Sequence, residues 1–132
     1  MAGETNLQKL LQTMSPVITP GEFVFCSFEN AAYGEHANLQ PIAAFAEAEG
    51  LTLVVPKQNA DAHGIDYESI FSCITLKVHS SLDAVGLTAA FATKLTEHNI
   101  SANVIAGFFH DHIFVPRELA GRATSAIKEL SR

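Results

Sequence analysis

The sequence repeats one pattern of secondary structure with a shift of 60 residues. Residues 41–60 and residues 101–120 each predict two strands joined by a turn, then a proline, then a helix. Identical residues coincide in this alignment: Ala46, Val55, Pro56 and Ala60 fall on Ala106, Val115, Pro116 and Ala120. A helix over 41–46 is the alternative, because "PIAAFAEAEG" is rich in alanine. The repeat favours two related units that share a sheet and a core.

Other apolar segments complete each unit. Strands are expected at 23–28 and 70–79, and Leu7 to Met14 predict a helix that Pro16 ends. Residues 80–99 form an amphipathic pattern, whereas only residues 29–40 separate the corresponding strands of the first half. The first half therefore lacks most of this crossover helix. The residues expected to be buried in the two C-terminal helices are Ala84, Leu87, Phe91, Leu95, Leu119, Ala123, Ile127 and Leu130.

The order of strand, helix, hairpin, helix and strand predicts an α+β fold. It is the split βαβ arrangement, in this chain two ferredoxin-like (βαββαβ) units with antiparallel sheets and helices on one face. We expect an N-terminal unit at 1–66 and a C-terminal unit at 67–132. The second unit ends in a helix without a closing strand. Residues 16–19 are the candidate for that strand.

Composition excludes several functional classes. Nearly half of the 132 residues are apolar, which fits a packed globular interior. The eight Lys and Arg residues are spread thinly and the net charge is −6, which argues against nucleic acid as a partner. No apolar run is long enough for a membrane helix, and the start lacks the features of a signal peptide. We expect a cytoplasmic protein with Cys26 and Cys73 as reduced, buried thiols.

The segment "FFHDHIFVP" places two histidines around an aspartate. If the strand includes all three, His110 and His112 share one face and Asp111 points away. A metal-dependent enzyme is then an alternative, with His79 as a conceivable third ligand. Nothing in the spacing requires His79 to reach the pair, and no nucleophile elbow or phosphate loop is present. We therefore expect no metal, no cofactor and no catalytic residue.

The stretches "HSSLDAVGL" and "HDHIFVP" resemble those of an ACT domain. The resemblance is to stand-alone bacterial tandem-ACT proteins and to the ACT domains of aspartokinases and arginine sensors. "EGLTLVVP" is similar to the degenerate repeat that precedes such a domain, and Val85 stands where the family usually has proline. The resemblance implies two ACT-type units, regulation through binding of a free amino acid, no chemistry of their own, and a homodimer. A structural dimerisation module without a ligand is the other alternative.

The loop before the helix at 80–99 can bind a carboxylate. Ser81 and Asp83 suit a helix start, and free amides there attract anions. The expected ligand-binding residues are Ser81, Asp83, Val85, Gly86, Leu87, Asn103 and Asp111. Asp111 would accept the ammonium group of an amino acid, and Asn103 would add a neutral contact. Each also has a structural interpretation: Asp83 as a cap, Gly86 as a packing glycine and Asp111 as a turn former.

Overall fold

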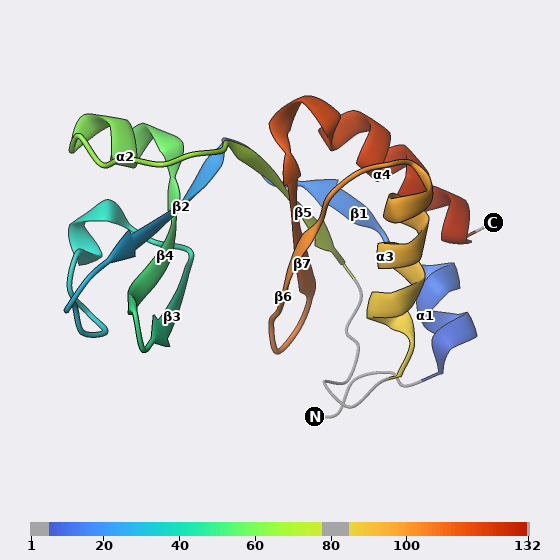
Figure 1. Ribbon diagram of the computed structural model, residues 1–132. Coiled ribbons are helices and arrows are strands. Elements are labelled where there is room, and N and C mark those ends of the chain that lie inside the picture. The colour runs from blue at the N-terminus through green and yellow to red at the C-terminus, as the bar shows by residue number, and fades with distance from the viewer. Residues whose placement is uncertain (1–5, 78–84, 132) are drawn as a thin grey trace. The chain divides into compact units, whose positions relative to one another are not determined.

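The structure is a computed structural model that describes residues 6–77 and 85–131 (Figure 1). It contains two compact units. Unit 2 is Pro20–Phe71, and unit 1 consists of the described parts of Met1–Thr19 and Ser72–Arg132. None of the helices within 6–77 and 85–131 is long and apolar enough to span a bilayer.

Unit 2 contains a three-stranded antiparallel sheet in the order β3-β4-β2. Only a 3-10 helix lies between β2 and β3, so the expected loss of the crossover helix is confirmed. The core includes Val24, Leu51, Leu53 and Val55, which are all buried. The elements are β2 (Phe23–Phe28), η1 (Ala37–Leu39), β3 (Ala43–Glu47), β4 (Gly50–Pro56) and α2 (Lys57–Ala62).

Unit 1 combines a four-stranded sheet in the order β1-β5-β7-β6 with its helices. The elements from the N-terminal segment are α1 (Leu7–Thr13) and β1 (Pro16–Ile18). Those from the C-terminal segment are β5 (Phe71–Leu76), α3 (Leu87–Glu97), β6 (Asn103–Ala106), β7 (Asp111–Pro116), η2 (Arg117–Leu119), α4 (Ala120–Lys128) and η3 (Glu129–Ser131).

The 60-residue repeat is present as two hairpins. β3 and β6 begin at Ala43 and Asn103, and β4 and β7 both end in the matching prolines, Pro56 and Pro116. A helical segment follows each hairpin directly. The alternative of a helix over 41–46 is wrong, because residues 43–47 pair with β4. The predicted α+β fold class, with two ferredoxin-like units and antiparallel sheets, is therefore confirmed.

The N-terminal segment supplies the closing strand of unit 1. β1 pairs antiparallel with β5, with Val17 opposite Thr75. Residues 1–19 were expected to belong to the first unit, at 1–66. In the structure α1 and β1 pack with the C-terminal segment instead. Unit 1 is therefore built from two separate stretches of chain.

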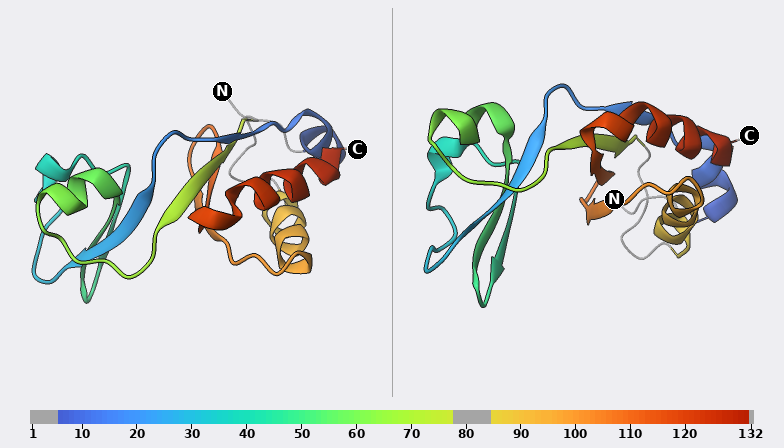
Figure 2. Two further views of the ribbon diagram at one scale, coloured as in Figure 1. Left: turned by 90° about the horizontal axis from the view of Figure 1, so that it is seen from above. Right: turned by 45° about the horizontal axis from the view of Figure 1, so that its top comes forward.

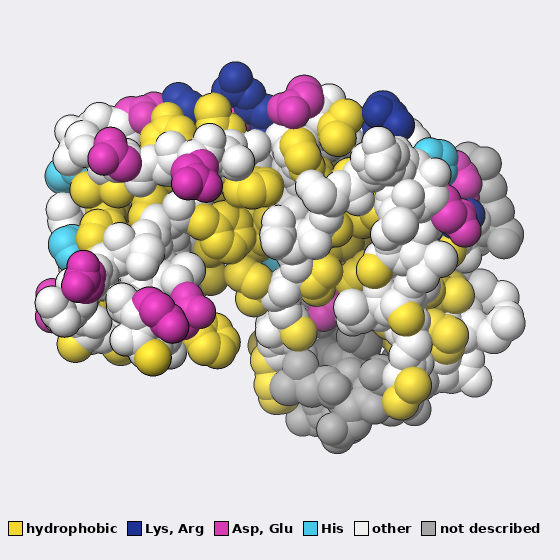
Figure 3. Space-filling model, viewed as in Figure 1, with side chains coloured by type: hydrophobic (Ala, Val, Ile, Leu, Met, Phe, Trp, Pro, Cys, Tyr) yellow, Lys and Arg dark blue, Asp and Glu magenta, His cyan; other side chains and the backbone are white. Residues whose placement is uncertain are grey.

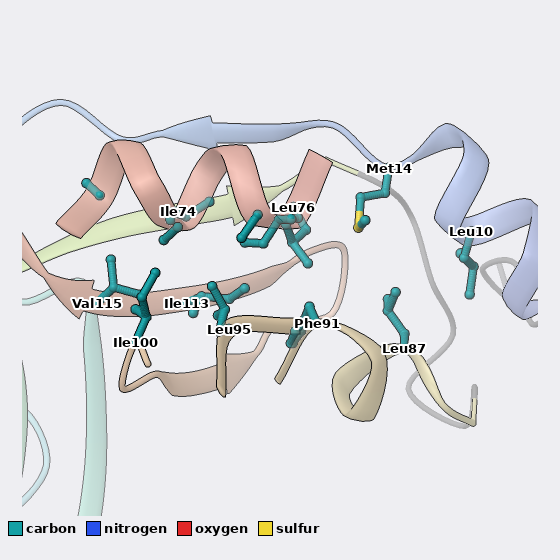
Figure 4. Packing of buried hydrophobic residues seen from close by; sticks show 14 residues of the cluster. Leu10, Met14, Ile74, Leu76, Leu87, Phe91, Leu95, Ile100, Ile113 and Val115 are labelled. Atoms are coloured by element: carbon teal, nitrogen blue, oxygen red, sulfur yellow. The ribbon is translucent and has the colours of Figure 1, made fainter. Parts of the chain in front are cut away.

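One face of the unit 1 sheet packs against the helices. Ile74 and Leu76 of β5 and Ile113 of β7 meet Phe91 and Leu95 of α3, and all five are buried (Figure 4). The expected burial of Leu87, Ala123 and Ile127 is also confirmed, and Leu119 and Leu130 are partly buried against the same core. Ala84 lies outside the described residues. Burial of such side chains provides about 1.5–3 kcal/mol each toward folding.

Candidate functional site

Asp111 is a buried carboxylate at the first position of β7. It is only 8% exposed and pairs with Ala106 of β6. Because side chains alternate along a strand, it shares a face with Ile113 and Val115, which pack toward the helices. Burial raises the pKa of the Asp111 carboxyl, and the nearby His112 and His110 lower it to a smaller extent.

No hydrogen bond joins the Asp111 carboxylate to another residue within 6–77 and 85–131, and neither of its oxygens is a fully buried atom without a partner. Buried charges in proteins are normally paired or hydrogen-bonded, because an unpaired buried charge is destabilising. Asp111 is the one buried charged residue within 6–77 and 85–131, so a cationic group of a ligand would offset the cost of burying its charge.

The end of unit 1 that holds Asp111 also holds the beginning of α3. The Thr75 hydroxyl is 3.0 Å from Nδ1 of His112, which places the last residues of β5 beside the first residues of β7. The tip of the β6–β7 hairpin and the first turn of α3 lie at this same end (Figure 1). The first residue of β7 and the start of α3 therefore lie at the same end of the unit.

The first turn of α3 has backbone amides that no helical hydrogen bond uses. The N-cap is Gly86, which has no side chain to cap them, and Ala90 makes the first helical hydrogen bond, to the Gly86 carbonyl at 2.9 Å. The amides of the first turn of any helix have no partner within the helix, and the helix dipole adds partial positive charge. This helix start can therefore attract an anionic group.

The structure gives the loop residues different environments. Ser81 and Asp83 lie outside the described residues. Val85 is 83% exposed, whereas the Leu87 side chain is buried in the core, so that only its backbone can meet a ligand. Gly86 has φ +98, and a Cβ there would lie 3.0 Å from Cδ2 of Leu7. Backbone conformation and close packing are thus enough to explain this glycine.

Asn103 is not brought to Asp111. It pairs with Phe114 at the start of β6, three residues before the Ala106–Asp111 pair. At about 3.4 Å per residue this is about 10 Å along the strand, and the odd spacing puts the two side chains on opposite faces. The structure therefore separates Asn103 from the carboxylate.

The histidine pair does not share a strand face. β7 begins at Asp111, so His110 belongs to the turn that precedes it. His112 faces the other side from Asp111, and burial lowers its pKa, with a further reduction from His110. Across residues 6–77 and 85–131, no three His, Cys, Asp or Glu side chains are grouped to hold a metal ion. His79 lies outside the described residues.

Two contributors to this region could not be identified from the sequence. Leu7 carries an ordinary helical hydrophobic pattern, and nothing local links it to Gly86, 79 positions later. The alternating pattern predicts Thr75 on the face of its strand opposite the helices, yet it is buried and hydrogen-bonded to His112. Contacts between segments distant in sequence leave no local signal.

Unit 2 has a surface pocket of about 480 Å³. It is lined by Gly21, Glu22, Pro56, Lys57, Gln58 and Asp61. The charged pair within it is already satisfied, since Lys57 Nζ is 2.7 Å from Asp61 Oδ2 and the Tyr67 hydroxyl donates to Oδ1 at 2.7 Å. The bond to Lys57 lowers the pKa of Asp61 most, and the bond to Tyr67 lowers it further. The bond to Asp61 raises the pKa of Lys57. The charged groups of this pocket already bind each other, so the pocket is a weaker candidate for ligand binding than the region around Asp111.

Comparison with known families identifies the fold. Two sequence profiles described as ACT domain match the chain in tandem, at residues 2–72 and 68–129. The chain belongs to the ACT domain family. ACT domains are generally regulatory modules that bind small molecules such as amino acids. No curated protein matches the chain.

Solved structures give the same architecture. A Vibrio cholerae protein of unknown function, described as a possible transport protein, is 53% identical over 96% of both chains, with a TM-score of 0.87. An Agrobacterium tumefaciens protein is 14% identical over 89% of both chains, with a TM-score of 0.73. The ligand-free regulatory subunit of aspartate kinase from Thermus thermophilus is 9% identical, with a TM-score of 0.63 over 92% of this chain and 99% of that chain. The last two show the ACT fold alone.

Proposed function

We propose that this ACT-domain protein is a cytoplasmic sensor that binds one free amino acid in unit 1 and acts through contacts between copies. The observation that carries the proposal is the Asp111 carboxylate, buried at the start of β7, at the end of unit 1 that also holds the first turn of α3. An α-amino acid carries an ammonium group that can donate to it. The two free cysteines fit the reducing cytoplasm.

The first turn of α3 supplies the complementary half of the site. Its free amides after Gly86 bind the carboxylate of the amino acid, while Asp111 binds the ammonium. Each charge-assisted hydrogen bond contributes about 1.5–3 kcal/mol, which corresponds to roughly ten- to a hundred-fold in affinity. Ser81 and Asp83, just before this turn in the sequence, belong to the same proposed site. Leu87 contributes its backbone only, because its side chain is buried, whereas the Val85 side chain is exposed.

Contacts between copies use the exposed edge of the unit 1 sheet. β6 is the last strand in the sheet order, and edge strands present unpaired backbone groups to other chains. Phe108 and Phe109 in the following turn are 61% and 60% exposed, and hydrophobic side chains are visible over this hairpin (Figure 3). An edge with exposed aromatic residues supports pairing with a second copy.

The test is a thermal-shift screen of the twenty protein amino acids, followed by titration calorimetry of any that raises Tm. Asp111→Asn keeps the shape, removes the charge, and should weaken binding by ten- to a hundred-fold. Glu118→Gln is the matched control, because it removes one exposed carboxylate of the same unit. Equal affinities of Asp111→Asn and wild type would exclude this site.

The competing function is a dimerisation module without a ligand. It shares the exposed β6 edge, so oligomeric state alone does not separate the two. A protein that dimerises in light scattering yet responds to none of the twenty amino acids would favour the dimerisation module.

A further inference from the structure

The N-terminal helix contacts the backbone at the start of α3. Leu7 is the first residue of α1, and its Cδ2 atom lies 3.0 Å from the position that a Cβ on Gly86 would take. Because Gly86 has no side chain, Leu7 faces the backbone of the N-cap itself. Figure 2 shows α1 beside α3 and the last turn, η3, and these elements are in contact.

α1 is fixed to unit 1 at several points. Leu10 is fully buried in the core that contains Leu87 and Phe91, and Met14 is nearly so. The Asn6 side chain caps the helix by accepting from the Lys9 amide at 3.0 Å. Beyond the helix, the Lys77 amide donates to the Ser15 carbonyl at 2.8 Å, next to the β1–β5 pairing. The helix is thus held between the end of β5 and the start of α3.

We infer that α1 is a positioning element for the proposed amino-acid site, with Leu7 as the residue that holds the first turn of α3 in place. The inference rests on the proposed function, since that turn is where the ligand carboxylate binds. Gly86 has a left-handed backbone conformation, φ +98, which glycine adopts without strain, so its own conformational preference does not hold the chain at the helix start and neighbouring side chains can. Leu7 is the side chain that does so.

This arrangement couples the ligand to the N-terminal segment. A ligand that orders the first turn of α3 also favours the docked position of α1, and undocking of α1 weakens the ligand site by the same free energy. Leu7 touches backbone and not the ligand, so it is a positioning residue. Its effect must differ from that of a leucine that only fills the core.

Leu11 provides the matched control. It lies one turn further along α1 and, like Leu7, is partly buried against the same core. Leu7→Ala and Leu11→Ala should therefore lose comparable stability, which urea denaturation measures. Only Leu7→Ala should weaken amino-acid binding, by about ten-fold, with Leu11→Ala within about two-fold of wild type. Leu7→Met should restore most of the affinity, because it keeps the length of the side chain.

A measurement without ligand separates this inference from the proposed function. The Ala90 amide makes the first hydrogen bond of α3, to Gly86, so its hydrogen-exchange rate by NMR reports on the helix start. We expect Leu7→Ala to raise that rate by about ten-fold more than Leu11→Ala does. Equal rates in the two variants would overturn the positioning role, whether or not an amino acid binds. Absence of amino-acid binding to the wild type, with the Ala90 effect present, would overturn the proposed function alone.

Discussion

Thr75 and His112 are joined across neighbouring strands by a hydrogen bond of 3.0 Å between Oγ1 and Nδ1. The Thr75 hydroxyl also lies 3.4 Å from that of Thr19, so polar side chains connect three segments of the sheet on the face away from the helices. Burial lowers the pKa of His112, which favours the neutral imidazole in the folded protein. In the tautomer with the proton on Nε2, neutral imidazole accepts a hydrogen bond from the Thr75 hydroxyl at Nδ1.

The burial of His112 makes stability depend on pH. The pKa of His112 is lower in the folded than in the unfolded protein, so its contribution to the free energy of unfolding is complete above about pH 6.5 and is lost as the pH falls through the folded pKa. Urea denaturation between neutral and mildly acidic pH should show a steeper loss for wild type than for His112→Gln. Parallel pH profiles for the two proteins would contradict this prediction.

Asp111→Asn should make the ligand-free protein more stable at neutral pH. Burial raises the pKa of Asp111 above its unfolded value, so the charged form is disfavoured by folding. The contribution of protonated Asp111 to the free energy of unfolding is complete below the pKa of this group in the unfolded protein. It is lost as the pH rises through the higher pKa of the folded protein. Asparagine carries no charge to desolvate at this position, so we expect the variant to be more stable by about 1–3 kcal/mol at pH 7, measured by urea denaturation. The advantage of the variant should shrink toward acidic pH, and a variant less stable than wild type at pH 7 would show that Asp111 is already paired.

Gly50→Ala should destabilise unit 2. Gly50 has φ +153, and a Cβ there would lie 2.8 Å from the Phe28 carbonyl oxygen. Strain of this kind costs about 1–3 kcal/mol, which thermal unfolding should detect as a lower Tm. Gly121→Ala in α4 is the control, because nothing lies within 4 Å of its added methyl group. It should leave Tm unchanged or raise it, since alanine favours a helix.

Replacing both exposed phenylalanines of the β6–β7 turn should weaken association between copies. Phe108 and Phe109 contact each other edge to face, with ring centroids 5.1 Å apart, and both are largely exposed. The Phe108→Ser, Phe109→Ser double variant should therefore remain folded, with a cooperative thermal transition. Its mass in light scattering should shift toward that of a single chain. Tyr33→Ser, at an exposed aromatic residue of unit 2, is the control. An unchanged mass would place the contact elsewhere.

Much of the fold could be predicted because it is encoded locally. The hairpin at 103–116 follows from alternating apolar residues and a turn, and the repeat carried that prediction to 43–56, where alanine-rich sequence also suits a helix. The partners of β1 could not be predicted with the same ease. Its three residues pair with the open edge of β5. That edge exists only once the rest of the sheet has formed, so the three residues alone do not predict the pairing.

The candidate site was predictable by residue type but not by environment. A charged residue next to a turn, such as Asp111, usually remains in solvent, and its burial depends on the packing of α3 and the hairpin. Asn103 was grouped with it on sequence alone, yet the register of β6 and β7 separates them. The proximity of Leu7 to Gly86 could not be predicted from the sequence, because the two residues belong to segments far apart along the chain.

The division of unit 1 into two stretches of chain sets an order of folding during synthesis. Thr19 contacts Thr75 across 56 positions of sequence, and the hairpin that completes the sheet comes later still. Unit 2 is continuous, so it can fold on the ribosome as soon as residues 20–71 have emerged. α1 and β1 must wait for α3 and α4, which are translated later, and during that time the apolar face of α1 is available to chaperones and β1 to the β5 strand of another nascent chain.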